Sequence, residues 1–175
     1  MGAEITFKRP DGGDAKGYLT NAARGDAPGV VVIQEWWGLA EQIKAMVDRF
    51  ALAGFDALAP DLFDGVVVPY HDADRAAKEM MSLNFLDATE QTVRGAVQYL
   101  KRNGAKVGIA GFCMGGAVAI IGAAKIPELT AAVSFYGLPP EQAAKPAEVK
   151  IALRAISPTR TITSRPRLSM LSRRR

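Results

Sequence analysis

A single cysteine, Cys113, lies in the stretch Gly111-Phe112-Cys113-Met114-Gly115, between an apolar run and a run rich in alanine and glycine. A lone cysteine is most often a small buried hydrophobic residue. G-x-C-x-G between a strand and a helix is, however, the nucleophile-elbow pattern with Cys in place of Ser. Such a turn requires residues without bulk at Gly111 and Gly115, and it places the thiol at a helix N-terminus, whose dipole favours a thiolate. The pattern therefore predicts Cys113 as a nucleophile.

A second stretch whose residues could take part in catalysis is Gln34-Glu35-Trp36-Trp37-Gly38, which follows a β-branched run. In an elbow arrangement, one oxyanion amide follows the nucleophile, here Met114, and the other follows an early strand, here Trp36. Glu35 lies between a buried strand and two tryptophans, a setting that suits a carboxyl group to proton exchange with a thiol. The alternatives are a solvated carboxylate for Glu35 and a purely structural role for either tryptophan.

Alternating strands and helices must position these two loops. Apolar runs predict strands at 29–34, 55–60, 106–111, 130–137 and 149–153, and helical spacing predicts helices at 41–53, 72–82, 87–102 and 115–125. Ile5 and Phe7 alternate as in a first strand, and Asp87 or Thr89 is expected to cap the helix at 87–102. This order predicts an α/β fold with a mostly parallel sheet, helices on both faces, and ligand groups at the carboxyl ends of the strands.

Composition narrows the class of protein. A chain of 175 residues suits one domain, and one cysteine excludes an internal disulfide and fits a reducing compartment. We find no signal-peptide pattern, no membrane-spanning run and no metal-ligand spacing, so we expect a cytoplasmic protein without a metal.

The net charge of +4 comes from the last part of the chain, where residues 152–175 hold seven arginines and no Asp, Glu or Lys. Removing these seven from the 22 basic residues leaves 15 against 18 acidic ones, a net charge of −3 for the rest. Three interpretations of this end compete: a basic arm for nucleic acid or membrane, a disordered tail, or a segment read in the wrong frame. The arginines are scattered among Ser, Thr and Pro, a mixture that GC-rich coding DNA tends to give out of frame.

The stretches VVVIQEWWGL, ALAPDLF, VGIAGFCMGG and AAVSFYG, in this order and spacing, resemble the dienelactone hydrolase family over roughly residues 5–151. The resemblance implies an α/β-hydrolase fold that opens enol-lactones and related esters without a cofactor. It implies Cys113 as nucleophile, the Trp36 and Met114 amides as the oxyanion hole, and Glu35 as the group that controls the protonation of the thiol.

Two further residues bear on the family pattern. The resemblance implies an arginine from a helical insertion that binds the substrate carboxylate. Arg75 is the nearest candidate, but its surroundings match only loosely, so a solvated surface position is favoured over this role. His71 is the one histidine of the chain, and it does not match the catalytic histidine of the family, which lies near the C-terminus. A surface position is expected for His71.

The family continues after the strand at 149–153 with an Asp, a helix, another strand and the catalytic His. From Ala155 onward, an alternative reading frame joins the third base of each codon to the first two bases of the next. Permitted codons in this frame can encode HFANTDDYITPAAVDALEAA, a sequence that resembles that continuation. We therefore favour the out-of-frame interpretation, with residues 1–153 as an incomplete hydrolase domain and 154–175 as a tail outside the family pattern.

The expected function is hydrolysis of a small-molecule ester or lactone through a thioester, although the family Asp and His are absent from this chain. The alternative is a catalytically dead remnant or binding module with the same fold. We expect no nucleic-acid or membrane partner, and the sequence leaves the oligomeric state open.

Overall fold

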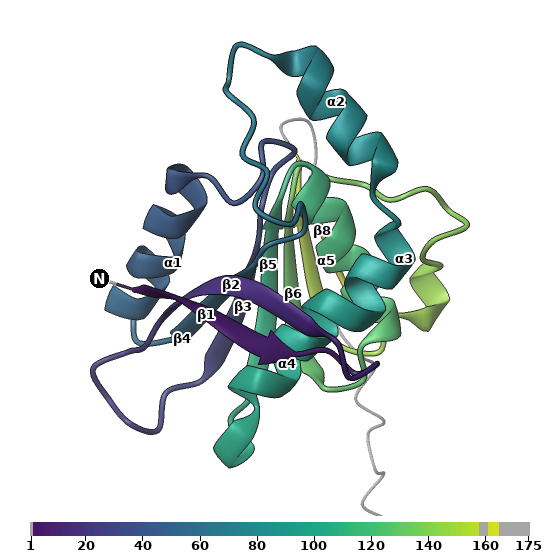
Figure 1. Cartoon of the computed structure of the whole chain (residues 1–175). Coiled ribbons are helices and arrows are strands. Elements are labelled where there is room, and N and C mark those ends of the chain that lie inside the picture. The colour runs from purple at the N-terminus through teal and green to yellow at the C-terminus, as the bar shows by residue number, and fades with distance from the viewer. Residues whose placement is uncertain (1, 158–160, 165–175) are drawn as a thin grey trace, which may run out of the picture.

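Eight strands form one mixed sheet in the order β1-β2-β4-β3-β5-β6-β7-β8 in the computed structural model, which describes residues 2–157 and 161–164 (Figure 1). The strands are β1 (Ala3–Lys8), β2 (Asp14–Thr20), β3 (Gly29–Ile33), β4 (Asp56–Pro60), β5 (Val107–Phe112), β6 (Leu129–Phe135), β7 (Ala152–Ile156) and β8 (Thr161–Ser164). The neighbours from β4 to β7 are parallel, and β1, β2 and β8 run antiparallel to their partners.

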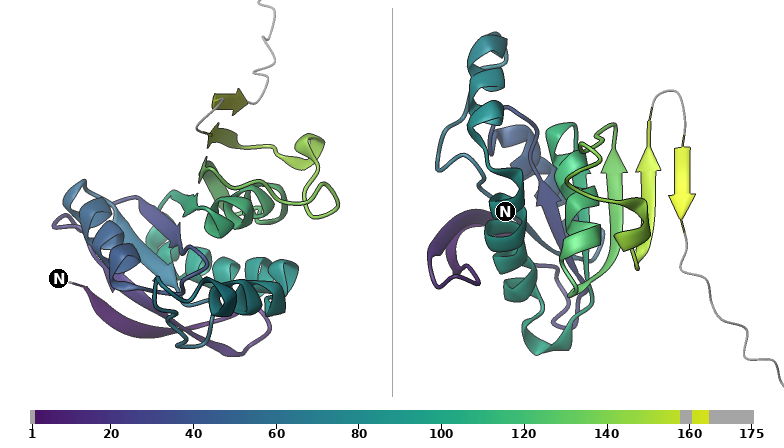
Figure 2. Two further views of the ribbon diagram at one scale, coloured as in Figure 1. Left: turned by 90° about the horizontal axis from the view of Figure 1, so that it is seen from above. Right: turned by 90° about the vertical axis from the view of Figure 1, so that its right-hand side faces the viewer.

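The central strand β3 is buried on both faces, as its β-branched run predicts. Its residues alternate between two cores: Val31 and Ile33 pack on the side of α4 (Arg94–Leu100) and α5 (Met114–Lys125), whereas Val30 and Val32 pack on the side of α1 (Glu41–Leu52). Helices therefore cover both faces of the sheet (Figure 2), and the predicted α/β architecture is confirmed.

The helices largely follow their predicted ranges. α1 ends where expected, because Gly54 takes a left-handed φ of 95° immediately after it. The segment predicted as one helix at 87–102 instead comprises α3 (Phe85–Asp87), the π-helical η1 (Ala88–Val93), α4 and the 3₁₀ turn η2 (Arg102–Gly104). The predicted caps were wrong: the Asn84 side chain caps this segment by accepting from the Asp87 amide at 3.2 Å.

The strand expected at 149–153 begins later, at Ala152, and pairs in parallel with β6. The boundary predicted after Leu153 thus falls inside β7, and β8 then pairs with the outer edge of β7 (Figure 2). The rest of the predicted tail, 158–160 and 165–175, lies outside the described residues.

The connections leave β3 and β5 in opposite directions. β3 leads through α1, on one face, to β4, and β5 leads through α5, on the other face, to β6. This divergence between neighbouring parallel strands is a topological switch point, where ligands of α/β proteins bind at the carboxyl ends of the strands. Along the described ranges, no helix is long and apolar enough to cross a membrane.

Candidate active site

Cys113 occupies a sharp turn between β5 and α5. Its backbone has φ 53° and ψ −120°, a conformation that is uncommon for a residue with a side chain and typical of a strained functional turn. The Cys113 amide donates to the Phe135 carbonyl at 3.0 Å, which ties the turn to the end of β6. The thiol is free and partly buried, and it lies at the start of α5.

The two elbow glycines permit close approach of backbone to backbone. A Cβ on Gly111, in β5, would collide with the carbonyl of Gly115 in the first turn of α5. A Cβ on Gly115 would lie 2.5 Å from the Gln34 carbonyl oxygen and 2.6 Å from that of Ile33. The loop after β3 therefore sits directly against the first turn of α5, which brings the two predicted stretches together.

This contact makes Gly115→Ala a destabilising substitution. The added methyl group meets backbone on the neighbouring strand, which cannot move without separating β3 from the elbow, so we expect a loss of about 2–3 kcal/mol in the free energy of unfolding. Gly122→Ala is the matched control on the same helix, because its Cβ would meet only side-chain ends at 3.3–3.5 Å. Urea denaturation followed by tryptophan fluorescence measures both; equal losses would contradict the proposed backbone clash.

The loop after β3, which contains Glu35 and Trp36, is held in place by contacts of its neighbouring side chains. The Gln34 side chain is fully buried, and its Oε1 accepts from the Leu62 amide at 3.2 Å. The Trp36 and Trp37 rings meet edge to face at 5.2 Å, and Trp36 packs against the main core. Glu35 in the same loop is partly buried.

Tyr136, which was not predicted as a site residue, connects Glu35 with the elbow. It directly follows β6 and has a left-handed φ of 47°. Its hydroxyl donates to Glu35 Oε1 at 2.9 Å, and no hydrogen bond joins Glu35 to Cys113 among the residues that the structure describes. Tyr136 is 53% exposed, but partial removal of its hydroxyl from water, the bond to Glu35, and the charges of Glu35 and of a Cys113 thiolate together raise its pKa to about 12. The phenol therefore remains a hydrogen-bond donor at neutral pH.

This pKa yields a test by titration. The phenolate absorbance of the wild type minus that of Tyr136→Phe is expected to rise with a midpoint near 12 rather than the ordinary 10.0. Because the pKa of Tyr136 is raised in the folded state, the protonated phenol contributes fully to the free energy of unfolding below pH 10. This contribution is lost as the pH rises through about 12. Glu35→Gln should move the midpoint back toward 10.0, and a wild-type midpoint already at 10.0 would contradict the pairing.

Three adjacent parallel strands thus each supply one group just past their carboxyl ends: Glu35 after β3, Cys113 after β5 and Tyr136 after β6. Met114 is the first residue of α5, so no carbonyl within the helix can accept its amide, which suits it to bind a developing oxyanion. Trp36 lies in the loop that contacts this turn.

A cavity of about 380 Å³ opens beside Cys113. Its lining comes from α2 (Ala73–Ser82), α3, α5 and the loop after β6: Met80, Phe85, Cys113, Met114, Ala117, Ile121, Tyr136, Gly137, Leu138, Pro140 and Ala143. The volume is within the range of small-molecule sites, and the nucleophile candidate itself forms part of the wall.

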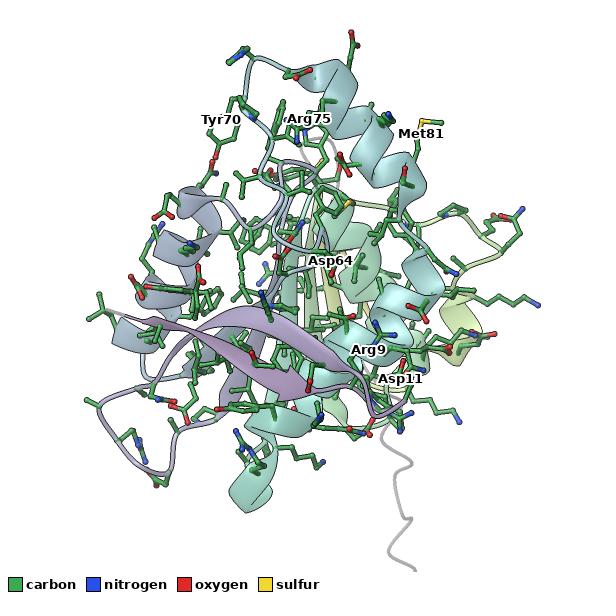
Figure 3. All side chains as sticks on the ribbon, viewed as in Figure 1. Arg9, Asp11, Asp64, Tyr70, Arg75 and Met81 are labelled. Carbon is green, nitrogen blue, oxygen red and sulfur yellow. The ribbon has the colours of Figure 1, made fainter. Side chains whose placement is uncertain are left out.

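Arg75 and His71 lie outside this lining. Arg75 is exposed in the first turn of α2, beside the loop of Tyr70 (Figure 3), and its amide donates to the capping side chain of Asp72 at 3.2 Å. His71 is exposed in the turn before α2, as expected. Within the described ranges, His, Cys, Asp and Glu side chains nowhere gather in threes that could hold a metal ion.

Comparisons with known proteins agree on one family. The sequence profile described as "Dienelactone hydrolase family" matches residues 15–158. "Protein usf" of Aquifex pyrophilus is 40% identical over 150 residues, covering 79% of this chain and 63% of that protein. The "Putative carboxymethylenebutenolidase" of Aquifex aeolicus is 36% identical over 150 residues, with the same coverage of 79% and 63%. The chain thus spans 63% of the length of each of these curated relatives.

Solved structures share the fold. A dienelactone hydrolase-like promiscuous phosphotriesterase from metagenomic libraries superposes with a TM-score of 0.70 at 27% identity, covering 88% of this chain and 67% of that one. A dienelactone hydrolase from Anabaena variabilis gives a TM-score of 0.64 at 20% identity, covering 90% and 73%. The α/β-hydrolase fold expected from the sequence is confirmed.

Proposed function

The chain belongs to the dienelactone hydrolase family, and we propose that it takes the acyl group of an enol-lactone or a related carboxylic ester onto Cys113. The observation that supports this most is the strained turn at Cys113, with φ 53° at the start of α5 and beside a cavity. A cysteine that only fills the core needs neither a left-handed backbone nor access to a pocket.

The acylation step that we propose uses Cys113, Glu35 and the amides of Met114 and Trp36. The proton of Cys113 Sγ passes to the Glu35 carboxylate, which accepts from the Tyr136 hydroxyl at 2.9 Å in this structure and must turn toward the thiol before it can take the proton. The thiolate attacks the carbonyl carbon, and the amides of Met114 and Trp36 bind the oxyanion. The ester C–O bond then breaks, the leaving oxygen takes the proton from Glu35, and a thioester remains on Cys113.

Hydrolysis of the thioester needs a base that activates water. The chain contains one histidine, and His71 lies exposed before α2, outside the cavity lining. We therefore infer that this chain acylates faster than it deacylates. If deacylation does not occur at all, the chain is a binding module without turnover, which is the second candidate function. The position of His71 outside the cavity lining favours this function as well.

An activated ester tests the proposal. p-Nitrophenyl acetate should release about one equivalent of nitrophenolate per chain in a rapid phase. Pretreatment with iodoacetamide should abolish this phase, because Cys113 is the only thiol in the chain. A release that survives complete alkylation of Cys113 would show that the reaction occurs elsewhere.

A further inference from the structure

We propose that the cavity beside Cys113 holds the acyl group of the substrate and selects an uncharged, apolar one. The inference rests on the proposed function, since it concerns the group that is attached to Cys113 once the ester C–O bond has broken; for a lactone, this group retains the leaving oxygen. It is carried by the chemistry of the lining and by the placement of the charged residues around it.

The cavity follows one face of α5. Met114, Ala117 and Ile121 line it at spacings of three and four residues, so its wall extends about 10 Å along the helix, at about 1.5 Å per residue. Ile121 is fully buried at the far end, and Leu138, which is 79% exposed, lies at the open side. Met80 of α2 and Phe85 of α3 also form part of the wall. A linear acyl chain or a single ring attached at Cys113 fits this shape.

Charged groups are kept out of this space. Among the described residues that line it, only the Cys113 thiol and the Tyr136 phenol can ionise, and the pKa of Tyr136 is raised to about 12. Glu35 binds the Tyr136 hydroxyl and is not part of the lining. Arg75 is not part of the lining, and Met81 projects outward from α2 (Figure 3). A carboxylate on the acyl group would therefore lose its hydration without gaining a cationic partner here.

Thiol-specific reagents test the cavity without relying on ester turnover. Cys113 attacks the sulfenyl sulfur of an alkyl methanethiosulfonate, forming a mixed disulfide and releasing methanesulfinate. We compare methyl, butyl and hexyl reagents with the anionic sulfonatoethyl reagent, each rate divided by its rate with glutathione. Each added methylene should raise the normalised rate about fourfold, which corresponds to about 0.8 kcal/mol. The anionic reagent should react at least about a hundredfold more slowly than the hexyl reagent.

The substitution Ala143→Leu tests whether the preference for the hexyl reagent arises in this cavity. Ala143 is partly buried in the lining, and leucine there fills the space, so the ratio of the hexyl rate to the methyl rate should fall at least about tenfold. Ala147→Leu makes the same change at an exposed position outside the cavity and should alter nothing.

Three results separate the inference from the proposed function. A sulfonatoethyl rate equal to or above the hexyl rate would overturn the inference, as would a hexyl preference that Ala143→Leu leaves intact. A hexyl preference that responds to Ala143→Leu, in a chain that no ester acylates, would uphold the cavity assignment and refute the proposed function.

Discussion

Cys113→Ser is expected to slow acylation by p-nitrophenyl acetate at least about a thousandfold. Serine keeps the size of the side chain and accepts the same turn, but its hydroxyl is far harder to ionise than a thiol. A hydroxyl group in the same position is therefore a much poorer nucleophile than the thiol. The substitution therefore removes the nucleophile and leaves the pocket.

The measurement is the rate of the rapid nitrophenolate phase, with His71→Ala as a control. His71 is exposed and outside the cavity lining, so its replacement should leave the rate unchanged. Retention of more than a tenth of the wild-type rate by Cys113→Ser would refute the nucleophilic role.

Accumulation of the thioester is the second large effect that we expect. Positioned general acid–base groups typically accelerate such steps by about 10²–10⁴-fold, and no imidazole lies in the cavity lining to activate water. Steady-state release of nitrophenolate should therefore be at least about a hundredfold slower than the rapid phase.

A version of the chain that is read in the alternative frame after Ala155 provides the comparison. It would carry the aspartates of the TDDY segment and whatever follows downstream, where the family places its histidine. We expect this version to turn over steadily. Equal steady-state rates for the two versions would contradict both the missing-base argument and the out-of-frame interpretation of residues 154–175.

Local patterns in the sequence were sufficient for the elbow and the central strands. Gly111 and Gly115 around Cys113 specify a tight turn whatever the rest of the chain does, because only glycine permits the observed backbone contacts. The β-branched run at 29–33 likewise requires burial on both faces. These features depend on residues close in sequence, so they can be predicted without knowledge of packing.

Features that depend on distant residues were missed. Tyr136 faces Glu35 across 101 positions of sequence, and its left-handed backbone follows no glycine or asparagine pattern. Its place just after β6 was nevertheless a usable signal, since the carboxyl ends of adjacent parallel strands converge. β2 escaped prediction because its sequence, DAKGYLT, is interrupted by Gly17 and carries two charges, whereas its pairing with β1 and β4 supplies the missing stabilisation.

The most direct test of the central claim is the intact mass of the chain after brief mixing with p-nitrophenyl hexanoate at neutral pH. We expect one added hexanoyl group, located on Cys113 by peptide mapping and removed by hydroxylamine, as a thioester requires. A chain that remains unmodified, or that carries the hexanoyl group on a lysine while Cys113 stays free, would contradict the assignment of Cys113 as the acyl acceptor.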